Sequence, residues 1–493
     1  MKSILSRFPF FLLLLPLFIV VHIEKQFYEL YRYELMYTRL AFIFLCPFAA
    51  WLFFRLFTKE VKKAAMLAFG SCLFIFYFNE IRYLMMRKFA GSFLSGYGFL
   101  LPALVILLVF FLYRVFKSKS NYRNTFLFLN TAFVLFILGD VALLVSRRQL
   151  NQSLAAKNTI ATPPCDTCVK PDIYYLLFDC YTSSQMLKQE FNYDNSGVDQ
   201  FLEERGFRII RNSKSNYNLT PFSMGSCFNM DYLKEVHINT DYYLRDYVPA
   251  LKTVYNNRLF PLLEKEGYEL VNHSVFNVKS HPTTLRLFDI WDIARLYDQY
   301  NFFKKTYMDL AWHLPRWLQF NVDENRGGAY ARNRDRNDTM AYSHLMRTLK
   351  PQSAKPRFVY THFLVPHTPF TFDSLGNRVG IRPMMTAEDE KMAYLQQTIY
   401  VNGILKRVVD SILSAAKRPL VIILQGDHGY RYNDIQQAEK EFPNLNAFYF
   451  YNRDYRLLND SMSNVNTFRV VFNTFLGKQY PMLPNKHYFL QYK

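Results

Sequence analysis

Residues 173–179 read Ile-Tyr-Tyr-Leu-Leu-Phe-Asp, a continuous apolar run closed by a carboxylate. A run without polar alternation indicates a strand buried on both faces, as in a parallel sheet covered by helices. Residues 420–424 (Leu-Val-Ile-Ile-Leu) repeat the pattern and lead into Gly426-Asp427-His428-Gly429, while residues 358–360 lead to His362. These runs predict an α/β domain with a central, mostly parallel sheet flanked by helices.

Helix and strand patterns alternate through the rest of this region. Helices are expected at 198–206, at 259–267 and, longest of all, at 391–416. Short strands are expected at 207–210, 268–271 and 446–451.

The first 148 residues have a different character. A membrane span needs ~20 mostly apolar residues. Runs of about this length occur at 8–23, 38–57, 65–86, 96–116 and 125–146. A cleaved signal peptide is the rival interpretation of the first run, but it has no convincing small-residue cleavage site and four more runs follow. We expect a bundle of about five transmembrane helices at 1–148, a linker at 149–170 and the α/β domain at 171–493.

The chain has 493 residues and a formal net charge of +19. The first 148 residues hold about 18 Lys and Arg against about 6 Asp and Glu, so most of the basic excess adjoins the expected spans. Membrane topology and anionic lipid explain it, and no basic stripe or motif indicates nucleic-acid binding. The basic loops 58–63 and 117–123 are expected in the cytoplasm, and five spans then leave the C-terminal domain outside.

Two further features of the sequence concern the linker and the fifth span. Cys165 and Cys168 form a CxxC pair just after the membrane segment. A local disulfide and a chance spacing both remain open, and a zinc knuckle would need a second ligand pair.

Asp140 lies within the fifth apolar run, and we expect it near the outer end, reaching the interface.

Potential metal or phosphate ligands follow the buried strands: Asp179, His362, His367, Asp427 and His428. In open α/β sheets the ligand crevice lies outside the carboxyl ends of the strands, so these side chains are expected to converge. Asp and His together suit zinc or manganese. Each residue also has a structural interpretation: a capping or turn carboxylate, a loop histidine between prolines, or a satisfied strand-end histidine.

Four stretches together, 170–181, 215–220, 362–370 and 426–429, resemble the alkaline phosphatase/sulfatase superfamily. The resemblance is to its membrane-anchored sulfatase-like bacterial members, of the lipoteichoic acid synthase and phosphoethanolamine transferase type. By position it implies Asp179, Asp427 and His428 as metal ligands and Thr220 as a nucleophile that also touches the metal. It implies His367 near the transferred phosphate. His362 is a candidate substrate-binding residue. One divalent ion, zinc or manganese, is expected, and a second is left open.

The resemblance implies a membrane-bound, metal-dependent phosphotransferase. It would move a phosphoethanolamine- or phosphoglycerol-type group from a phospholipid donor to an envelope glycan or lipid acceptor, through a phospho-threonine intermediate. The protein would be a multi-pass protein of the bacterial inner membrane, with its catalytic domain on the periplasmic side. A sulfatase-like hydrolase of phosphate or sulfate esters and a non-catalytic envelope scaffold are the alternatives.

Three departures from the family pattern bear on this choice. Cys180 stands where the relatives usually have glycine, which would narrow the approach to the metal. Aspartate at 179 is typical of phosphatases and sulfatases, whereas the transferases tend to have glutamate. Neither Thr220 nor Cys227 has the C/S-x-P-x-R context of formylglycine sulfatases. By composition alone, Thr220 would be a threonine in a polar loop.

Overall fold

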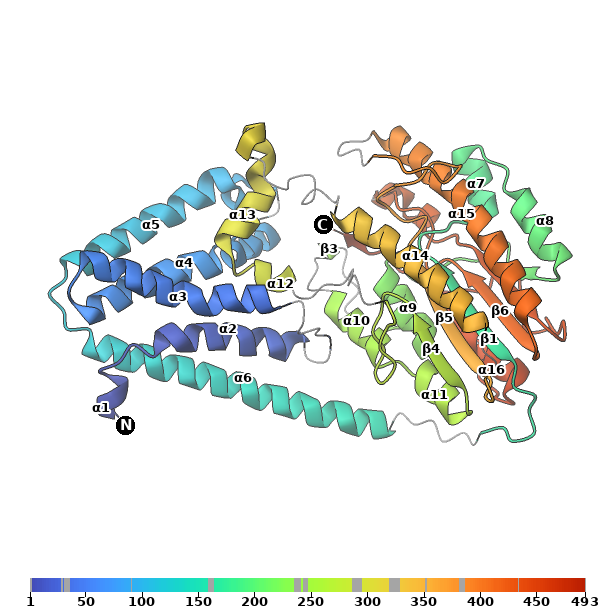
Figure 1. Ribbon diagram of the computed structural model, residues 1–493, viewed down its shortest axis with the longest axis horizontal. Helices are drawn as coiled ribbons and strands as arrows, with labels where there is room; N and C mark the ends of the chain where they lie inside the picture. Colours follow the sequence, from blue (N-terminus) through green and yellow to red (C-terminus); the bar gives the residue numbers. More distant parts are fainter. Residues whose placement is uncertain are drawn as a thin grey trace. The chain divides into compact units, whose positions relative to one another are not determined.

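The computed structural model describes residues 2–27, 30, 36–89, 91–157, 164–234, 241–242, 247–285, 295–318, 329–350, 353–380, 386–432 and 434–492. These residues form two compact units (Figure 1). The first comprises Met1–Thr159 with Trp291–Val322, and the second comprises Ile160–Ile290 with Asp323–Lys493.

The first unit is built from long apolar helices. They are α2 (Phe11–Phe27), α3 (Tyr37–Phe57), α4 (Val61–Lys88), α5 (Tyr97–Lys117) and α6 (Arg123–Lys157), with the short α1 (Lys2–Leu5) and η2 (Phe93–Ser95). Within the described residues, four helices are long and apolar enough to cross a membrane: α3, α4, α5 and the 123–146 part of α6. A span was also expected at 8–23. The helix found there, α2, has 17 residues, which is the lower limit for crossing a membrane. The protein is therefore a membrane protein.

Asp140 of α6 has ionic partners inside the helix bundle. Its carboxylate accepts from His22 Nδ1 at 2.8 Å and pairs with Lys25, both on α2. The Asp140 residue is 8% exposed. A charge at this depth is stabilised only when it is paired, so these contacts join α2 to α6. Asp140 is thus engaged within the bundle rather than only reaching outward.

A segment from the middle of the chain also belongs to the first unit. It contains α12 (Arg295–Asp298), α13 (Phe302–Leu310), η4 (Ala311–His313) and η5 (Arg316–Leu318). The division predicted from the sequence placed these residues in the α/β domain. In the structure their aromatic side chains pack on α4, with Phe302 4.9 Å from Phe74 between ring centroids.

The second unit contains a six-stranded sheet with the order β2-β7-β6-β1-β5-β4. The strands are β1 (Asp172–Phe178), β2 (Arg208–Ile209), β4 (Glu269–His273), β5 (Arg357–Phe363), β6 (Leu420–Gln425) and β7 (Asn446–Phe450). The four neighbours β6, β1, β5 and β4 are parallel, and β7 is antiparallel to both β6 and β2. A pair, β3 (Asp241–Tyr242) and β8 (Gln491–Tyr492), lies outside it. The expected mostly parallel sheet is confirmed.

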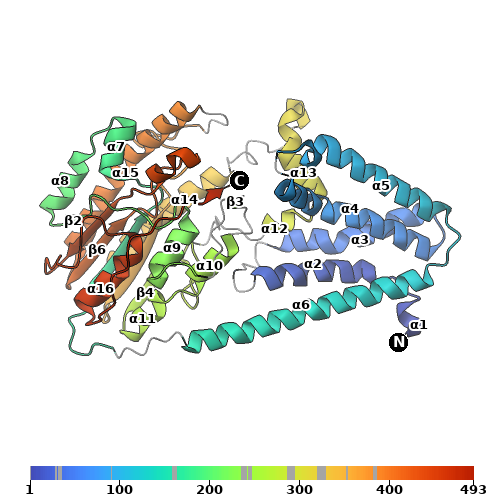
Figure 2. The ribbon, with the colours of Figure 1, turned by 180° about the vertical axis from the view of Figure 1, so that it is seen from behind.

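Helices cover both faces of the sheet (Figures 1 and 2). Leu176 and Phe178 of β1 join a core with α8 (Ser196–Glu204), α14 (Ala329–Leu349) and α15 (Ala387–Ala415). Tyr175 faces the other way, against Phe468 of α16 (Thr467–Phe475) and Phe228 of α9 (Thr220–Asn229). The remaining elements of this unit are α7 (Ser184–Phe191), α10 (Tyr247–Tyr255), α11 (Leu259–Lys265), η7 (Ile435–Glu441) and η8 (Asn464–Asn466). Burial on both faces explains why β1 has no polar alternation.

The start of the second unit is held by a disulfide and a buried carboxylate. Cys165 and Cys168 are joined, which confirms the local disulfide. Glu266, 4% exposed, accepts from the Cys165 backbone N–H at 3.1 Å and pairs with Lys170 at 3.2 Å and Lys478 at 2.8 Å. These contacts fix the point at which the chain enters β1.

Candidate active site

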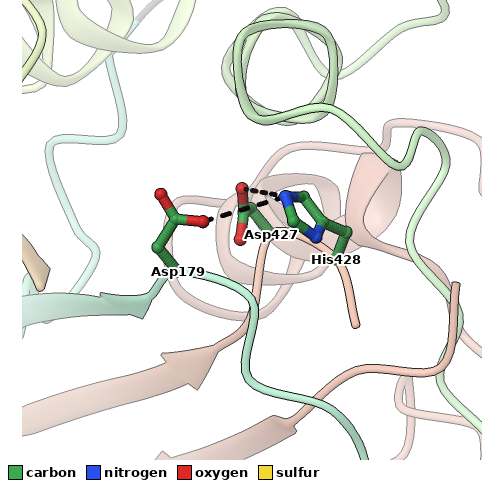
Figure 3. A group of neighbouring side chains, drawn as sticks. All are labelled: Asp179, Asp427 and His428. Atoms are coloured by element: carbon green, nitrogen blue, oxygen red, sulfur yellow. Dashed lines mark ion pairs between the residues drawn. The ribbon is translucent and has the colours of Figure 1, made fainter. Parts of the chain in front are cut away.

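Three potential metal ligands meet at the carboxyl ends of two neighbouring parallel strands. Asp179 directly follows β1, and Asp427 and His428 follow β6 (Figure 3). One ligand atom from each lies within 4.8 Å of the others. His428 Nε2 is 3.3 Å from Asp427 Oδ2 and 3.8 Å from Asp179 Oδ1. All three residues are buried. The convergence predicted from the strand ends is therefore present.

The two glycines of the Gly-Asp-His-Gly stretch let the backbone turn tightly around this site. A Cβ at Gly426 would lie 2.4 Å from the Tyr181 carbonyl oxygen, and one at Gly429 would lie 2.4 Å from the Pro443 carbonyl oxygen. A side chain at either position would collide with backbone, so glycine is required there. The turn brings Asp427 and His428 to the same point.

The donor set fits a divalent cation. Asp179 Oδ1 and Asp427 Oδ2 are buried and accept no hydrogen bond. Burial, and then the charge of Asp427, raise the pKa of the Asp179 carboxyl well above its usual range, against the opposing effects of Arg431, Arg334 and the Thr220 hydroxyl. Two buried carboxylates can both ionise only beside a positive charge. Among the described residues, this is the one group of three such side chains with metal-ligand geometry.

His428 presents a lone pair to the same point. Its Nδ1 lies 2.8 Å from the Gly429 carbonyl oxygen, so Nδ1 carries the proton and Nε2 is unprotonated. Burial, and then the charge of Arg431, lower the pKa of the imidazole well below its usual range. A neutral ring whose other nitrogen donates to a carbonyl is the usual arrangement of a metal-binding histidine.

Thr220 is the first residue of α9, not a loop residue as its composition suggested. Its Oγ1 lies 3.4 Å from His428 Nε2 and accepts from Arg431 Nη2 at 3.4 Å. Pro221 follows it, a residue that favours the first turn of a helix because its missing N–H is not needed there. The hydroxyl thus lies at the positive end of α9, beside the buried ligand set.

Arg431 is the functional candidate that the sequence interpretation missed. Its Nη2 donates to His428 Nε2 at 2.7 Å, a contact that would have to open when that nitrogen binds a cation, and its Nε donates to the Asn218 carbonyl oxygen at 3.1 Å. The only signal in the sequence was its position two residues after Gly429, which says nothing about Thr220. The fold brings this cation within hydrogen-bond distance of the Thr220 hydroxyl.

The two other predicted histidines lie nearby in different settings. His362, 1% exposed on β5, has its Nε2 3.4 Å from Asp179 Oδ2, and burial lowers its pKa to about 4. His367 lies with its ring centroid 6.4 Å from that of His428, and its Nδ1 is 2.6 Å from the Thr368 carbonyl oxygen. Burial, and then Arg431, lower the pKa of His367 well below its usual range. Both rings are therefore neutral near pH 7.

Cys180 does not crowd the ligand atoms as the sequence suggested. Its backbone N–H donates to Asp427 Oδ1 at 3.0 Å, and its thiol donates to the Gly429 carbonyl oxygen at 3.1 Å. Its φ of 67° is in the left-handed region that glycine favours and that other residues rarely adopt. The thiol is directed into the turn, and burial raises its pKa well above the usual value.

The sequence leaves His273, His281, His344 and His487 for a second metal site; His281 Nε2 is buried without a hydrogen-bond partner, and the other three have partners. His273 uses both ring nitrogens, at 2.7 Å from Thr284 Oγ1 and 2.8 Å from Thr348 Oγ1. His344 lies 3.1 Å from Thr284 Oγ1, and His487 donates to the Ser215 carbonyl oxygen at 2.8 Å. Among the described residues, no second group of three such side chains has metal-ligand geometry.

Buried polar side chains hold the loop that carries His367. Arg334, 1% exposed on α14, donates to the His367 carbonyl oxygen and to Thr371 Oγ1, the latter at 3.2 Å. Gln397 donates to the same carbonyl at 3.1 Å. Asp338 accepts from the Leu364 N–H at 2.6 Å through Oδ1, whereas its buried Oδ2 has no hydrogen-bond partner.

Asp338 gives the protein a pH-dependent stability. Burial raises its pKa to about 7, so between its unfolded pKa and pH 7 the folded state binds the extra proton. The protonated Asp338 carboxyl therefore stabilises the folded state at low pH, and this stabilisation is lost as the pH rises through 7. We expect Asp338→Asn to raise the apparent Tm relative to wild type by roughly 2–4 °C more at pH 8 than at pH 5. Thermal unfolding at both pH values tests this, and a constant difference would contradict it.

Comparisons with known proteins agree with this architecture. A sequence model of the Sulfatase family matches residues 182–470, more than half of the chain. A comparison with curated proteins finds no match.

The chain is also similar to solved structures at low identity. The C-terminal periplasmic domain of EcEptC from Escherichia coli is 11% identical, with a TM-score of 0.39 over 65% of this chain and 87% of that one. The integral membrane protein lipooligosaccharide phosphoethanolamine transferase A (EptA) from Neisseria meningitidis is 12% identical, with a TM-score of 0.39 over 89% and 88%. The phosphonate monoester hydrolase of Agrobacterium radiobacter is 11% identical, with a TM-score of 0.37 over 62% and 73%. Similarity at this level assigns no role to any residue.

Proposed function

The chain belongs to the sulfatase family and is a sulfatase-like enzyme, and from this premise we propose that it is a membrane-bound, metal-dependent phosphotransferase. Its substrate is a phospholipid whose phospho-headgroup, of the phosphoethanolamine or phosphoglycerol type, passes to an envelope glycan or lipid. One observation carries the proposal. The Thr220 hydroxyl, at the start of α9, lies within 3.4 Å of both Arg431 and the lone-pair nitrogen of His428.

The membrane helices support a lipid donor. An enzyme with four helices that can span a bilayer is held at the surface where phospholipid headgroups are concentrated. The basic loops between α3 and α4 and between α5 and α6 favour the cytoplasmic side for that end of the bundle. We therefore place the α/β domain on the periplasmic side of a bacterial inner membrane, where envelope acceptors are found.

Asp179, Asp427 and His428 would hold one divalent cation, zinc or manganese. When bound, the cation neutralises phosphoryl oxygens and lowers the pKa of the threonine hydroxyl. The three protein ligands leave room for Thr220 and substrate oxygen, as in catalytic rather than structural sites.

Two displacements at phosphorus complete the transfer. In the first, Thr220 Oγ1 forms a bond to phosphorus and the bond from phosphorus to the diacylglycerol oxygen breaks, with the threonine proton ending on that oxygen. In the second, an acceptor hydroxyl oxygen bonds to phosphorus, the bond to Thr220 Oγ1 breaks, and the acceptor proton returns to Thr220. Neutral His367 has a free Nε2 lone pair that can take and return this proton.

A hydrolase with the same site is the second candidate, because aspartate stands at position 179. In that case water replaces the acceptor hydroxyl in the second displacement. The third reading, a non-catalytic scaffold, loses its support because the family assignment and the buried ligand set both favour an enzyme.

Intact-mass analysis after incubation with phospholipids tests the proposal. The full-length protein in detergent, loaded with zinc or manganese, is mixed with phosphatidylethanolamine or phosphatidylglycerol. We expect diacylglycerol release and a mass increase that identifies the transferred group, with the adduct on Thr220. Acceptor-dependent loss of the adduct indicates a transferase, and loss to water alone indicates a hydrolase. Metal binding without an adduct or diacylglycerol from either lipid would overturn the lipid-donor proposal.

Arg431 provides a separate prediction. Replacing a fixed cation that faces the reacting oxygen removes transition-state stabilisation, so Arg431→Gln should lower kcat/KM by about 100-fold or more. Arg431→Lys retains the charge but not the planar, bidentate geometry, and should recover part of the loss. Steady-state kinetics on the three proteins measure the effect. Wild-type kcat/KM in Arg431→Gln would show that the guanidinium does not face the substrate.

A further inference from the structure

The segment 295–318 is attached to the helices of the first unit by aromatic packing and a backbone hydrogen bond. The Phe302 ring of α13 lies 5.0 Å from Phe78, and Tyr300 lies 5.9 Å from Tyr77, both on α4. Asn79, 4% exposed, donates to the Gln299 carbonyl oxygen at 3.0 Å. The chain thus leaves the α/β domain between two of its elements, and the segment 295–318 packs against the membrane helix α4.

Two ion-paired carboxylates, of which Asp298 is buried, show at which end of the bundle the segment lies. Asp298 accepts two hydrogen bonds from Arg39, near the start of α3, at 3.0 and 3.3 Å. Asp309 accepts from Arg82, near the end of α4, at 3.2 Å, and from Tyr97, the first residue of α5, at 2.7 Å. Because successive helices run in opposite directions, these three positions lie at the same end. It is the end opposite the basic loops 58–63 and 117–123.

The segment exposes several large apolar side chains beside Lys304, whose own side chain is 45% exposed. Phe303 is 58% exposed, Met308 41% and Trp317 73%. The adjoining ends of the membrane helices also expose large apolar side chains, namely Leu84 of α4, Phe93 of η2 and Phe99 of α5. The segment and the adjoining helix ends therefore expose the same kind of large apolar side chain.

From this arrangement we propose that residues 295–318 form an interfacial lipid-binding segment. Phe303, Met308 and Trp317 enter the outer leaflet at the boundary between headgroups and acyl chains. The occupant is lipid because the segment is fastened to the ends of helices that are long and apolar enough to span a bilayer, where Lys304 and Lys305 pair with Asp298 and Asp309. A large aromatic side chain at this level of a membrane protein is typical of the membrane–water interface. The proposal is independent of the reaction that the enzyme catalyses.

Spin-label accessibility in reconstituted vesicles tests it. Full-length protein carrying a nitroxide at Phe303→Cys or Trp317→Cys is placed in vesicles of phosphatidylethanolamine and phosphatidylglycerol. Collision rates with oxygen, which concentrates in lipid, and with a water-soluble nickel chelate are then compared. Phe110→Cys on α5 is the lipid-exposed control, and Asn452→Cys, on an exposed loop of the second unit, is the aqueous control. The unsubstituted chain gives the background from its own four free cysteines.

We expect the ratio of oxygen to nickel accessibility at positions 303 and 317 to be several-fold above that at 452 and to approach that at 110. A ratio equal to that at 452 would place the face in water and overturn the proposal. Protection from both reagents would also overturn it, because the face would then be covered by protein, either a partner or a second copy. If Trp317→Cys does not fold, Met308→Cys supplies the second position.

Discussion

Thr220→Ala is expected to lower turnover by about a thousandfold or more while leaving the metal bound, because it removes the atom that would bond to phosphorus. The substitution deletes the hydroxyl and methyl groups of a residue that is 2% exposed and leaves the α9 backbone intact, with Pro221 still in the first turn. Diacylglycerol release from phospholipid, measured under single-turnover conditions, reports the loss. Intact mass reports the absence of the adduct.

Thr220→Ser is the matched control for this prediction. It keeps the hydroxyl oxygen beside Arg431 and His428 and removes one methyl group, so it should retain the covalent adduct and much of the rate. If Thr220→Ala still turns over within about tenfold of wild type, the phospho-threonine route is excluded and direct attack by the acceptor on the lipid phosphate replaces it.

Asp427→Asn has the second large expected effect. We expect it to weaken metal binding and to raise the thermal stability of the metal-free protein. The amide oxygen can still accept from the Cys180 N–H, which donates to Oδ1 at 3.0 Å. The other oxygen, Oδ2, accepts no hydrogen bond and faces the ligand set, and the substitution replaces it by an NH2 group, which can only donate. We expect zinc or manganese affinity to fall by about 100-fold or more, and activity to fall with it.

Without metal, the same variant should be more stable than wild type. Removing the Asp427 charge relieves the repulsion that raises the pKa of Asp179. Thermal unfolding with and without added metal measures both effects. Wild type should gain Tm on metal addition and Asp427→Asn should gain little, because only a ligand that binds the folded state stabilises it. Asp454→Asn, outside the site, is the control. An equal metal-induced gain in both variants would contradict the assignment of Asp427 as a ligand.

The sheet could be predicted from local sequence because a strand that is buried on both faces appears as a continuous apolar run. Residues 173–178 and 420–424 have no polar position, and they became β1 and β6. The carboxyl ends of parallel neighbours must lie together, so the meeting of Asp179 with Asp427 and His428 followed from those two runs. The apolar spans likewise follow from length and composition alone. The family resemblance added Thr220, which its own polar surroundings would have assigned to a loop.

Other parts of the site and fold were decided only by tertiary structure. Arg431 meets Thr220 across 211 positions of sequence, and no local pattern records that contact. The long α14, which carries Arg334 and Asp338 behind the His367 loop, is too polar along much of its length to show a clear apolar stripe. The segment 295–318 leaves the α/β domain for the membrane helices because Asp298 and Asp309 find Arg39 and Arg82 there. The sequence by itself therefore determined the sheet, the apolar spans and the meeting of the three potential metal ligands, because a buried strand or a span appears in the sequence as an apolar run. The contact of Arg431 with Thr220 and the attachment of residues 295–318 to the membrane helices were decided by tertiary structure, because a contact between distant residues exists only once both elements have packed.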